Sequence, residues 1–425
     1  MPSPSTLPPE KAIRLLPESA HIVGAPGCGT PETLLRTLGE SADLLHAPTL
    51  YSGLQLGGYP FLDAVRQGHL RYLTWHPYGP ARHSVSAGFG EYVPARASAV
   101  PGLFDHWDTD AALVRVSPPD RNGYCSLGPS ASYVRAAVTR ARVVLAEVDP
   151  LVPRTYGDTT LHVSEITALV EADTPMCEFH EAPRDEIGDR IAAHVLDLLP
   201  ERPALQFGLG SIPESLIHAL ANSDLHGAHV IGMATDAMVA LFERGVLSPL
   251  SVMPSPAISA VELMGTRTLM DFADRNPAIG VFDSRTGHTP RHLGGLPGLV
   301  SVNSAVEVDL FGQVNSETVR GIQVSGIGGG VDFAEGAHGS PGGLSVIAIG
   351  SRTADGRHSR IVPALASDAV VTLPRHTPDA IVTEYGVAWL RGKTRAERAE
   401  SIASVAHPHH RAGLMSASAA VTTAK

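Results

Sequence analysis

The sequence predicts an α/β protein in which mainly parallel sheets are covered by helices. Apolar runs of strand length alternate with helical stretches along the chain. These runs are continuously apolar, as in parallel strands that are buried on both faces. Both halves of the chain also show a helix, a strand, a glycine-containing turn and another helix in the same order. Together these observations favour two α/β units of related architecture.

The strand-like runs are connected by helical stretches in a regular order. AHIVGAPG at residues 20–27 precedes the helical TPETLLRTLGESADLL, and ARVVLAEVDP at 141–150 follows the helical SASYVRAAVTRA. In the second half, ALQFGLGSIP at 204–213 leads into the helical ESLIHALAN. The other expected strands are residues 112–120, 229–231, 344–351, 368–374 and 379–386.

A polar stretch near the middle of the chain marks the expected domain boundary. HEAPRDE precedes a new helical stretch, which divides the chain into an N-terminal domain of residues 1–187 and a C-terminal domain of residues 188–425. The turns GAPGCGTPETLL and FGLGSIPESLI, one in each half, are loosely similar. This similarity is only weak evidence for an internal repeat.

Composition limits the classes of function. The 425 residues include 32 basic and 43 acidic side chains, a formal charge of −11, and 43% are apolar. This balance argues against nucleic acid or an anionic membrane as main partner. No run of 18 apolar residues offers a membrane span, and the first residues lack the apolar core of a signal peptide, so we expect a cytoplasmic protein. Cys28, Cys125 and Cys177 suggest neither a disulfide framework nor a metal site.

Two glycine-rich turns are candidates for ligand binding. GLGSIPES follows a strand and opens a helix, so Gly208, Gly210, Ser211 and Ile212 could present amides to an anion or oxyanion. QVSGIGGGVDF could lie against a phosphate, a pantetheine or a thioester carbonyl. Its glycines are Gly326, Gly328, Gly329 and Gly330. The alternatives are a tight strand–helix turn and a flexible surface loop.

Other chemical candidates carry weaker signals. Cys125 has no activating histidine nearby in sequence and is expected to be a buried structural thiol. AHPHHR at 406–411 resembles a metal cluster but fits a solvated histidine run better. A basic cluster could bind cofactor phosphates or simply cap and solvate a helix; it comprises Arg391, Lys393, Arg395 and Arg398.

Several motifs, in this order, resemble the acetyl-CoA hydrolase/transferase family, which contains 4-hydroxybutyrate CoA-transferase. They include VSPPDRNGYCSLG, PRTYGDTTLHVSEI, GLGSIP, SVNSAVEVDLFGQVNSE and SGIGGGVDFAEGA, and the resemblance spans roughly residues 20 to 410. It implies two CoA-transferase-type α/β domains, usually a homodimer, with a coenzyme A thioester as substrate and no metal. It also implies ping-pong chemistry, in which a glutamate attacks the acyl-CoA and becomes a glutamyl-CoA thioester. The two glycine-rich turns match the family's oxyanion and CoA-contact turns.

The chain departs from this family at the nucleophile. Thr235–Ala237 and Gly245–Val246 match the family's landmarks without a gap, and Val230–Gly232 then takes the place of a His-Thr-Glu tripeptide. The position of the lost glutamate is Gly232, in an expected turn that runs to Thr235. In NPAIGVFD, Gly280 stands where the family often has a second glutamate.

These observations lead to three hypotheses. The first is an enzyme that transfers or rearranges the acyl group of an acyl-CoA or pantetheine thioester by direct attack of an acceptor, in specialised biosynthesis. Amides at Gly210–Ile212 and Gly328–Gly329 would hold the oxyanion, Lys393 would contact CoA, and the polar helpers would be Asp236, Asp283, Ser284 and His288. The second is an ordinary hydrolase or carboxylate CoA-transferase with a substitute carboxylate, Asp283 being the foremost candidate. The third is a non-catalytic homologue.

Overall fold

The computed structural model describes residues 4–250 and 255–423 and divides into two compact units. Unit 1 comprises residues 1–180, 232–236 and 258–288. Unit 2 comprises residues 181–231, 237–257 and 289–425. The units are therefore discontinuous in sequence, whereas the expected domains, 1–187 and 188–425, are contiguous stretches.

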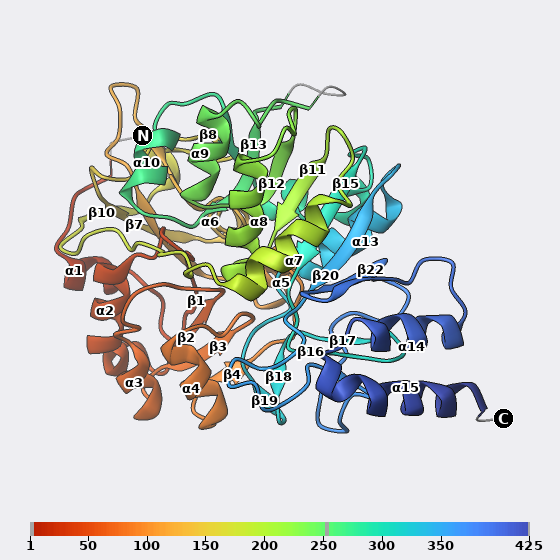
Figure 1. Ribbon diagram of the computed structural model, residues 1–425. Coiled ribbons are helices and arrows are strands. Elements are labelled where there is room, and N and C mark those ends of the chain that lie inside the picture. Colours follow the sequence, from red (N-terminus) through yellow and green to blue (C-terminus); the bar gives the residue numbers. More distant parts are fainter. Residues whose placement is uncertain (1–3, 251–254, 424–425) are drawn as a thin grey trace. The chain divides into compact units, whose positions relative to one another are not determined.

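Unit 1 contains a seven-stranded sheet in which every pair of neighbours is parallel (Figure 1). In sheet order the strands are β10 (Ala168–Glu171), β7 (Val143–Val148), β5 (Ala111–Val116), β1 (His21–Gly24), β2 (Thr49–Ser52), β3 (Arg71–Thr74) and β4 (Glu91–Tyr92). The helices around it are α1 (Pro9–Ile13), α2 (Glu32–Glu40), α3 (Leu62–Arg66), α4 (Pro80–Ser86), α5 (Val100–His106) and α6 (Val134–Arg140). The predicted class, parallel sheets covered by helices, is confirmed.

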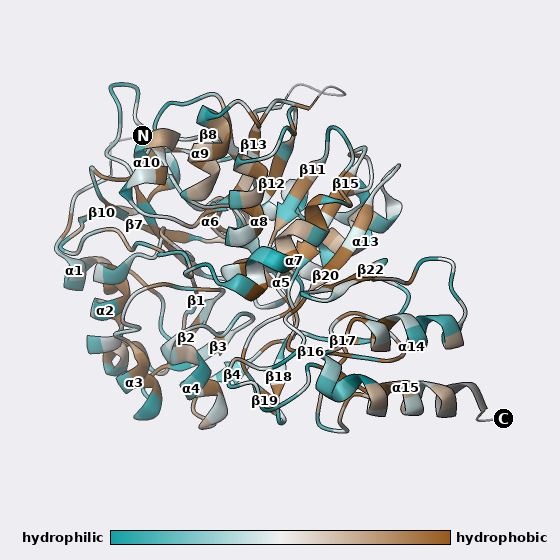
Figure 2. Cartoon of the chain, in the orientation of Figure 1, coloured by the Kyte–Doolittle hydropathy of each residue, from teal (hydrophilic) through white to brown (hydrophobic). Residues whose placement is uncertain are grey.

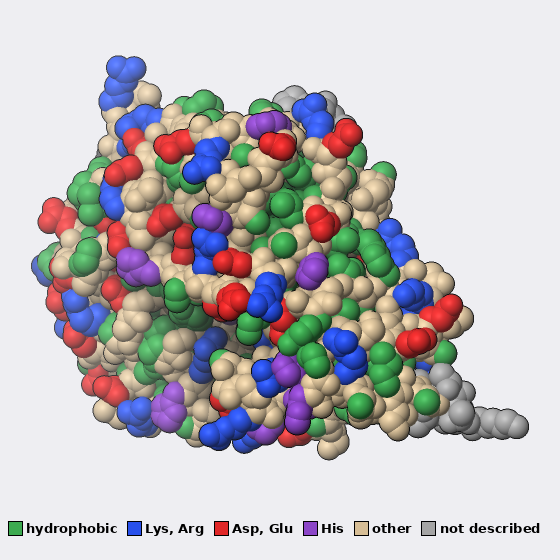
Figure 3. Space-filling view, viewed as in Figure 1, with side chains coloured by type: hydrophobic (Ala, Val, Ile, Leu, Met, Phe, Trp, Pro, Cys, Tyr) green, Lys and Arg blue, Asp and Glu red, His purple; other side chains and the backbone are tan. Residues whose placement is uncertain are grey.

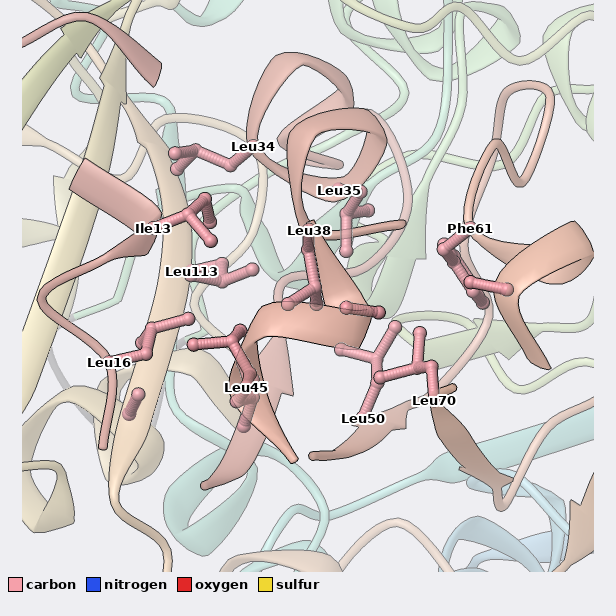
Figure 4. Packing of buried hydrophobic residues seen from close by; sticks show 14 of the residues in the cluster. Ile13, Leu16, Leu34, Leu35, Leu38, Leu45, Leu50, Phe61, Leu70 and Leu113 are labelled. Carbon is pink, nitrogen blue, oxygen red and sulfur yellow. The ribbon is translucent and has the colours of Figure 1, made fainter. Parts of the chain in front are cut away.

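Both faces of this sheet are buried, which explains its continuous apolar strands. On one face Ile22 and Leu113 pack with side chains of α1, α2 and α3, as seen in Figure 4 for Leu34, Leu38 and their neighbours. On the other face Val23 packs in a second cluster with side chains of α5 and α6. Burial of this apolar surface is the main source of the unit's stability.

A second group of strands in unit 1 comes from later in the chain. β13 (Ile258–Leu263), β14 (Ile279–Val281) and β8 (Tyr156–Gly157) are parallel neighbours. The short helices α10 (Arg267–Ala273) and α11 (Ser284–Gly287) follow β13 and β14, and an antiparallel ribbon joins β6 (Tyr124–Ser126) to β9 (Thr160–His162). Unit 1 therefore contains residues that are far apart in sequence.

Unit 2 is built on strands that are parallel except at one edge. In sheet order they are β23 (Gly386–Trp389), β22 (Ala380–Thr383), β20 (Leu344–Ala348), β15 (Leu299–Asn303), β11 (Ala204–Phe207) and β12 (His229–Ala234). Only the β22–β23 pair is antiparallel among the pairings described for these strands. The chain passes from unit 2 to unit 1 within β12, between Ile231 and Gly232.

The helices of unit 2 cover its sheet and form a pair at the end of the chain. They are α7 (Glu186–Leu196), α8 (Ser211–Ala221), α9 (Ala237–Glu243), α12 (Pro290–Leu293), α13 (Gly330–Gly339), α14 (Arg395–Ser404) and α15 (Pro408–Thr423). Figure 2 shows hydrophilic and hydrophobic residues together on α7, as expected for a helix with one buried side. Helices α14 and α15 lie side by side and share the apolar cluster of Ile402, Ala403 and Leu414.

Small strands complete unit 2. They are β16 (Glu307–Asp309), β17 (Val314–Asn315) and β21 (Ile361–Val362) in one sheet, and β18 (Thr318–Val319) and β19 (Ile322–Gln323) in a hairpin. The predicted strand at 368–374 is wrong. Val370 and Val371 are exposed, and only Leu373 makes an isolated bridge, to Val314.

The surface agrees with the charge balance of the sequence. Acidic and basic side chains are interspersed on the face shown in Figure 3. No helix among the described residues is both long enough and apolar enough to cross a membrane.

A buried ion cluster joins the central strands of unit 1. The Arg115 side chain on β5 is fully buried and donates to Asp149 Oδ2 at 3.0 and 2.7 Å. Its Nη1 atom also lies 3.1 Å from Glu147 Oε1 on β7. Burial raises the pKa of Glu147 to about 7, and the charge of Arg115 opposes this rise. Glu147 in turn accepts a hydrogen bond from the Leu34 amide at 3.2 Å, in the first turn of α2.

We expect Arg115→Met to lower the free energy of unfolding of unit 1 by about 3–5 kcal/mol, because two buried acids lose their partner. The matched control is Arg36→Met, which removes a partly exposed pair with Asp173 and should cost under about 1 kcal/mol. Urea unfolding followed by circular dichroism measures both. Equal shifts of the two midpoints would contradict a structural role for the buried cluster.

Candidate functional site

The two predicted glycine-rich turns of unit 2 meet at one side chain, that of Asn303. A Cβ atom added to Gly208 would lie 3.6 Å from Asn303 Oδ1, and one added to Gly330 would lie 3.8 Å from the same atom. Asn303 ends β15, while Gly208 follows the neighbouring strand β11. The structure therefore brings both turns to the carboxyl ends of adjacent parallel strands, where ligands commonly bind in α/β proteins.

A side-chain network fixes Asn303 in this place. Its amide nitrogen donates to Gln206 Oε1 at 3.0 Å and to Ser301 Oγ at 2.9 Å. In return, Gln206 Nε2 donates to Asn303 Oδ1 at 3.1 Å, and Ser301 Oγ donates to Gln206 Oε1 at 2.8 Å. Gln206 and Ser301 are buried, so the network links the ends of β11 and β15 beneath the turns.

Each turn opens a helix whose first amides lack an intrahelical acceptor. The first N–H groups of an α-helix have no acceptor within the helix. The N-cap residues of α8 and α13 are Gly210 and Gly329, which have no side chain to cap these helices. The amides of Ser211 and Ile212 open α8, whereas the Gly208 amide already donates to Val302 O at 3.1 Å. Positive helix ends of this kind attract anions and developing oxyanions.

The second turn is placed slightly later than the sequence indicated. Gly328 has a φ of 58° and Gly329 has a near-helical backbone, so α13 begins at Gly330. The N–H groups at its start therefore belong to Gly330 and the residues after it, whereas Gly328 and Gly329 were the expected donors. Gly326 is buried, and the three glycines after Ile327 are partly exposed.

Gly232 lies within a strand rather than in a turn. β12 extends to Ala234, so the expected turn at residues 232–235 is wrong for its first three residues. The Met264 amide donates to Ala234 O at 2.8 Å, which places β13 beside this part of β12. Gly232 is buried and has a φ of 104°, a backbone conformation that other residues rarely adopt. Gly280 is likewise buried, in the middle of β14.

Asp236 makes the contacts of a helix cap. Its carboxylate accepts hydrogen bonds from the Thr266 amide at 3.0 Å, the Thr266 hydroxyl at 2.7 Å and the Leu269 amide at 3.1 Å. These groups surround the start of α10. The carboxylate therefore stabilises a helix N-terminus, and a part for Asp236 in catalysis stays a prediction.

Asp283, Ser284 and His288 lie together around α11. Asp283 caps this short helix through the Arg285 amide at 2.7 Å and pairs with the Arg285 guanidinium at 2.8 Å. Ser284 Oγ lies 3.0 Å from His288 Nδ1, and both side chains are buried. Burial lowers the pKa of His288 to about 4, so its ring is neutral near pH 7.

The basic cluster is engaged in local structure. Lys393 Nζ lies 2.9 Å from Ser401 Oγ, which belongs to α14. Arg391 pairs with the buried carboxylate of Asp379 at 2.6 Å, and Arg398 donates to Leu390 O at 3.0 Å. These three side chains therefore contact other residues of unit 2, and contact of Lys393 with CoA stays a prediction.

Neither the histidine run nor Cys125 shows the geometry of a reactive site. His407, His409 and His410 stack edge to face at the start of α15, and no metal-binding group of three His, Cys, Asp or Glu side chains occurs in the described part of the chain. Cys125 is buried, and burial raises its pKa to about 11, which keeps the thiol protonated.

One polar residue of this region was missed at the sequence level. Glu262 lies on β13 and is only 9% exposed. Burial raises the pKa of its carboxyl group to about 8, and the nearby hydroxyls of Ser130 and Ser132 reduce this rise only in part. Neither hydroxyl has a good hydrogen-bond geometry to it: both carboxyl oxygens lack a hydrogen-bond partner among residues 4–250 and 255–423. The acidic residue within the apolar run SAVELMG was the available signal.

Comparison with known proteins gives a consistent result. Residues 7–180 match the acetyl-CoA hydrolase/transferase N-terminal domain, and residues 265–418 match the C-terminal domain. The 4-hydroxybutyrate coenzyme A transferase of Clostridium kluyveri is 39% identical over 352 residues, which cover 82% of each protein.

Solved structures agree with the sequence matches. RipA from Yersinia pestis is similar with a TM-score of 0.89 at 28% identity, covering 98% of both chains. A 4-hydroxybutyrate CoA-transferase from Porphyromonas gingivalis is similar with a TM-score of 0.81 at 28% identity, covering 97% of this chain and 96% of the other. The similarity to both structures therefore extends over nearly the whole chain.

We expect Gly210→Ala to lower the free energy of unfolding by about 1–3 kcal/mol, because φ 129° and ψ −178° form a conformation that is essentially restricted to glycine. An added methyl group there would meet no atom within 4 Å, so the cost is one of backbone strain. Gly413→Ala within α15 is the control and should be neutral or stabilising, since its added methyl group is also unobstructed. Chemical unfolding measures both, and an unchanged midpoint for Gly210→Ala would show that the turn tolerates another conformation.

Proposed function

Because the chain belongs to the acetyl-CoA hydrolase/transferase family and is an acyl-CoA transferase or hydrolase, we propose that it passes the acyl group directly to an acceptor. In this proposal no glutamyl-CoA intermediate forms. The donor is a coenzyme A or related pantetheine thioester. The acceptor is a second small molecule, and a reaction of specialised biosynthesis is the setting that we favour.

The observation that carries the proposal is Gly232. The family resemblance assigns a nucleophilic glutamate to this position, and glycine has no side chain that could attack a thioester. The φ of 104° at Gly232 also disfavours any other residue there. Loss of a polar group at Gly280 supports the same interpretation, because two candidate acids are then missing from one unit.

Retention of the glycine-rich turns supports continued thioester chemistry. We propose that the amides of Ser211 and Ile212, after Gly208 and Gly210, hold the negative oxygen of the tetrahedral intermediate. The turn from Gly326 to Gly330 is proposed to lie against the thioester. A well-placed oxyanion donor lowers the activation free energy by about 3–4 kcal/mol, so such amides are effective without a covalent nucleophile.

The polar side chains around α11 are proposed helpers. The hydrogen bond between Ser284 and His288 provides a neutral imidazole beside a hydroxyl group, a pair that could orient a small-molecule acceptor by hydrogen bonding. Asp283 is the candidate for a substitute nucleophile in an ordinary hydrolase or CoA-transferase. Its carboxylate is held by the guanidinium and amide of Arg285, which reduces its nucleophilicity and favours direct attack instead.

The proposed oligomeric state follows what the family resemblance implies. We propose a homodimer in the cytoplasm, with an acyl-CoA and an acyl or CoA acceptor as its small-molecule partners. The third hypothesis, a non-catalytic homologue, predicts thioester binding without turnover. Measurements of CoA thiol release and of an enzyme–CoA adduct separate it from the other two hypotheses.

We expect turnover of a short acyl-CoA without a covalent enzyme–CoA adduct, because residue 232 offers no carboxylate. Release of CoA thiol is measured with a thiol reagent, and intact-mass spectrometry of the denatured protein measures the adduct. An enzyme-bound CoA thioester would contradict direct transfer and favour a substitute carboxylate. Binding without thiol release, for a panel of acyl chains and acceptors, would favour the non-catalytic hypothesis.

Gly232→Glu is expected to give weak CoA transfer from acetyl-CoA to acetate, where the parent shows none. The rate should stay low, because the strain at φ 104° costs about 1–3 kcal/mol and positioning partners are missing. Adding Gly280→Glu should increase the rate further. Gly232→Gln is the matched control, since it has the same size and strain but no nucleophile. Acetate-dependent transfer through an adduct in the parent itself would contradict the loss of the nucleophile.

A further inference from the structure

Glu262 is a buried carboxylic acid that no structural role in unit 1 explains. The buried acid Glu147 is paired with Arg115, whereas the groups that act on the Glu262 carboxyl are the hydroxyls of Ser130 and Ser132. Its two oxygens make no hydrogen bond of good geometry within the described part of the chain. A buried polar group without a partner is costly, and such groups commonly mark functional sites.

The backbone around Glu262 is shaped to leave room for its carboxyl group. A Cβ atom added to Gly27 would lie 3.3 Å from Glu262 Oε2 and 3.0 Å from the sulfur of Met264. Gly27 has a φ of 56° and lies in the turn between β1 and α2. The same turn passes Ser130, whose hydroxyl would lie 2.8 Å from a Cβ atom added to Gly29. Larger residues at these glycines would therefore displace the acid or its neighbours.

Glu262 is also close in structure to the strand that carries Gly232. β13 runs beside the last residues of β12, through the hydrogen bond from the Met264 amide to Ala234 O. Thr235, the next residue of that chain segment, is buried and its hydroxyl has no partner within the described residues. The acid therefore lies at the same end of neighbouring strands as the position of the lost nucleophile.

Further unpaired polar groups surround the turn between β1 and α2. The Ser132 hydroxyl and the Gln55 side-chain oxygen are buried without a hydrogen-bond partner among the described residues. Gln55 is joined to Gly27 by a backbone bridge, and Ser132 donates its amide to Val261 O at 3.2 Å, next to Glu262. A polar ligand in this region would satisfy several of these groups at once.

We propose that Glu262 is the general acid–base of the direct acyl transfer and that its acceptor therefore carries an O–H or N–H group. This inference rests on the proposed function. A carboxylate acceptor has no proton to lose and needs no base, whereas an alcohol, an amine or water does. The inference thus names the acceptor class that direct transfer leaves open.

The proton balance of the step is simple. The Glu262 carboxylate removes one proton as the oxygen or nitrogen of the acceptor bonds to the acyl carbon. The carbon–sulfur bond then breaks, and the same carboxyl group gives the proton to the departing CoA thiolate. One acyl-CoA and one acceptor yield one acylated acceptor and one CoA thiol.

The electrostatic surroundings of Glu262 suit a role as general acid–base. Burial raises the pKa of Glu262 to about 8, which is close to the operating pH that favours acid–base catalysis. The titratable groups that interact electrostatically with Glu262 are Cys28 and Tyr133, and Asp236 also interacts with Cys28. Burial raises the pKa of both Cys28 and Tyr133, so the thiol and the phenol stay neutral when Glu262 ionises.

The test compares Glu262→Gln with the parent from about pH 6 to about pH 10, a range of about 2 units on either side of the raised pKa. Acetyl-CoA is the donor, hydroxylamine is the N–H acceptor, and the enzyme-free rate is subtracted. We expect the parent rate to rise with pH to a plateau above an apparent pKa near 8. Glu262→Gln should lower kcat by roughly 100-fold or more and abolish this pH dependence, with little change in the affinity for CoA.

Two further measurements keep the outcome clear. The pKa of Glu262 is raised in the folded state, so ionisation of this group costs stability. The thermal midpoint of the parent should therefore fall as pH rises through about 8. The midpoint of Glu262→Gln should fall less. Glu147→Gln is the control, because it replaces another buried glutamate of unit 1. Assayed at a temperature below its thermal midpoint, this variant should keep the parent's dependence of rate on pH. Parent-like rates and pH profile in Glu262→Gln would overturn the inference and leave direct transfer intact. An adduct on any residue of the parent would instead overturn direct transfer, and an adduct on Glu262 itself would overturn both.

Discussion

The paired side-chain amides of Gln206 and Asn303 are the interaction on which the candidate site of unit 2 depends. Together with Ser301 they join the carboxyl ends of two adjacent strands, and both glycine-rich turns pass over Asn303. Both helices that follow have glycine as the N-cap residue, so no N-cap side chain competes with a ligand for their first amides. A network of several mutual hydrogen bonds is stiff, and stiffness is what an oxyanion site needs, because its donors must be in place before charge develops.

Unit 1 contains both Gly232 and Glu262, the two residues on which the proposed direct transfer rests. The backbone at Gly232 has a conformation suited to glycine. The neighbouring strand carries Glu262, whose carboxyl group is buried against Gly27. A nucleophile must reach the thioester carbon itself, whereas a proton-transfer group needs only hydrogen-bond reach of the acceptor. An acid on the next strand can meet the second requirement without meeting the first.

Sequence patterns predicted the fold class and most central strands, because continuous apolar runs directly reflect burial on both faces. They failed at residues 368–374, where Val370 and Val371 have the composition of a strand but are exposed. The glycine-rich turns were found because the absence of side chains is visible in sequence. Glu262 was not, because its burial depends on packing against Gly27 and Ser130, which are distant in the chain. Likewise, nothing in the sequence around Asp236 distinguished a helix cap from a catalytic acid.

The interleaved order of the two units bears on how the protein can be made and divided. Unit 1 is complete only when residues 258–288 have been synthesised, so its folding during translation must wait until the first two of the three segments of unit 2 have also been made. A fragment of residues 1–180 would contain the seven-stranded sheet but lack β13, β14 and Glu262. Expression of separate halves therefore cannot isolate an intact unit, and a cut at any single peptide bond leaves at least one unit in two pieces.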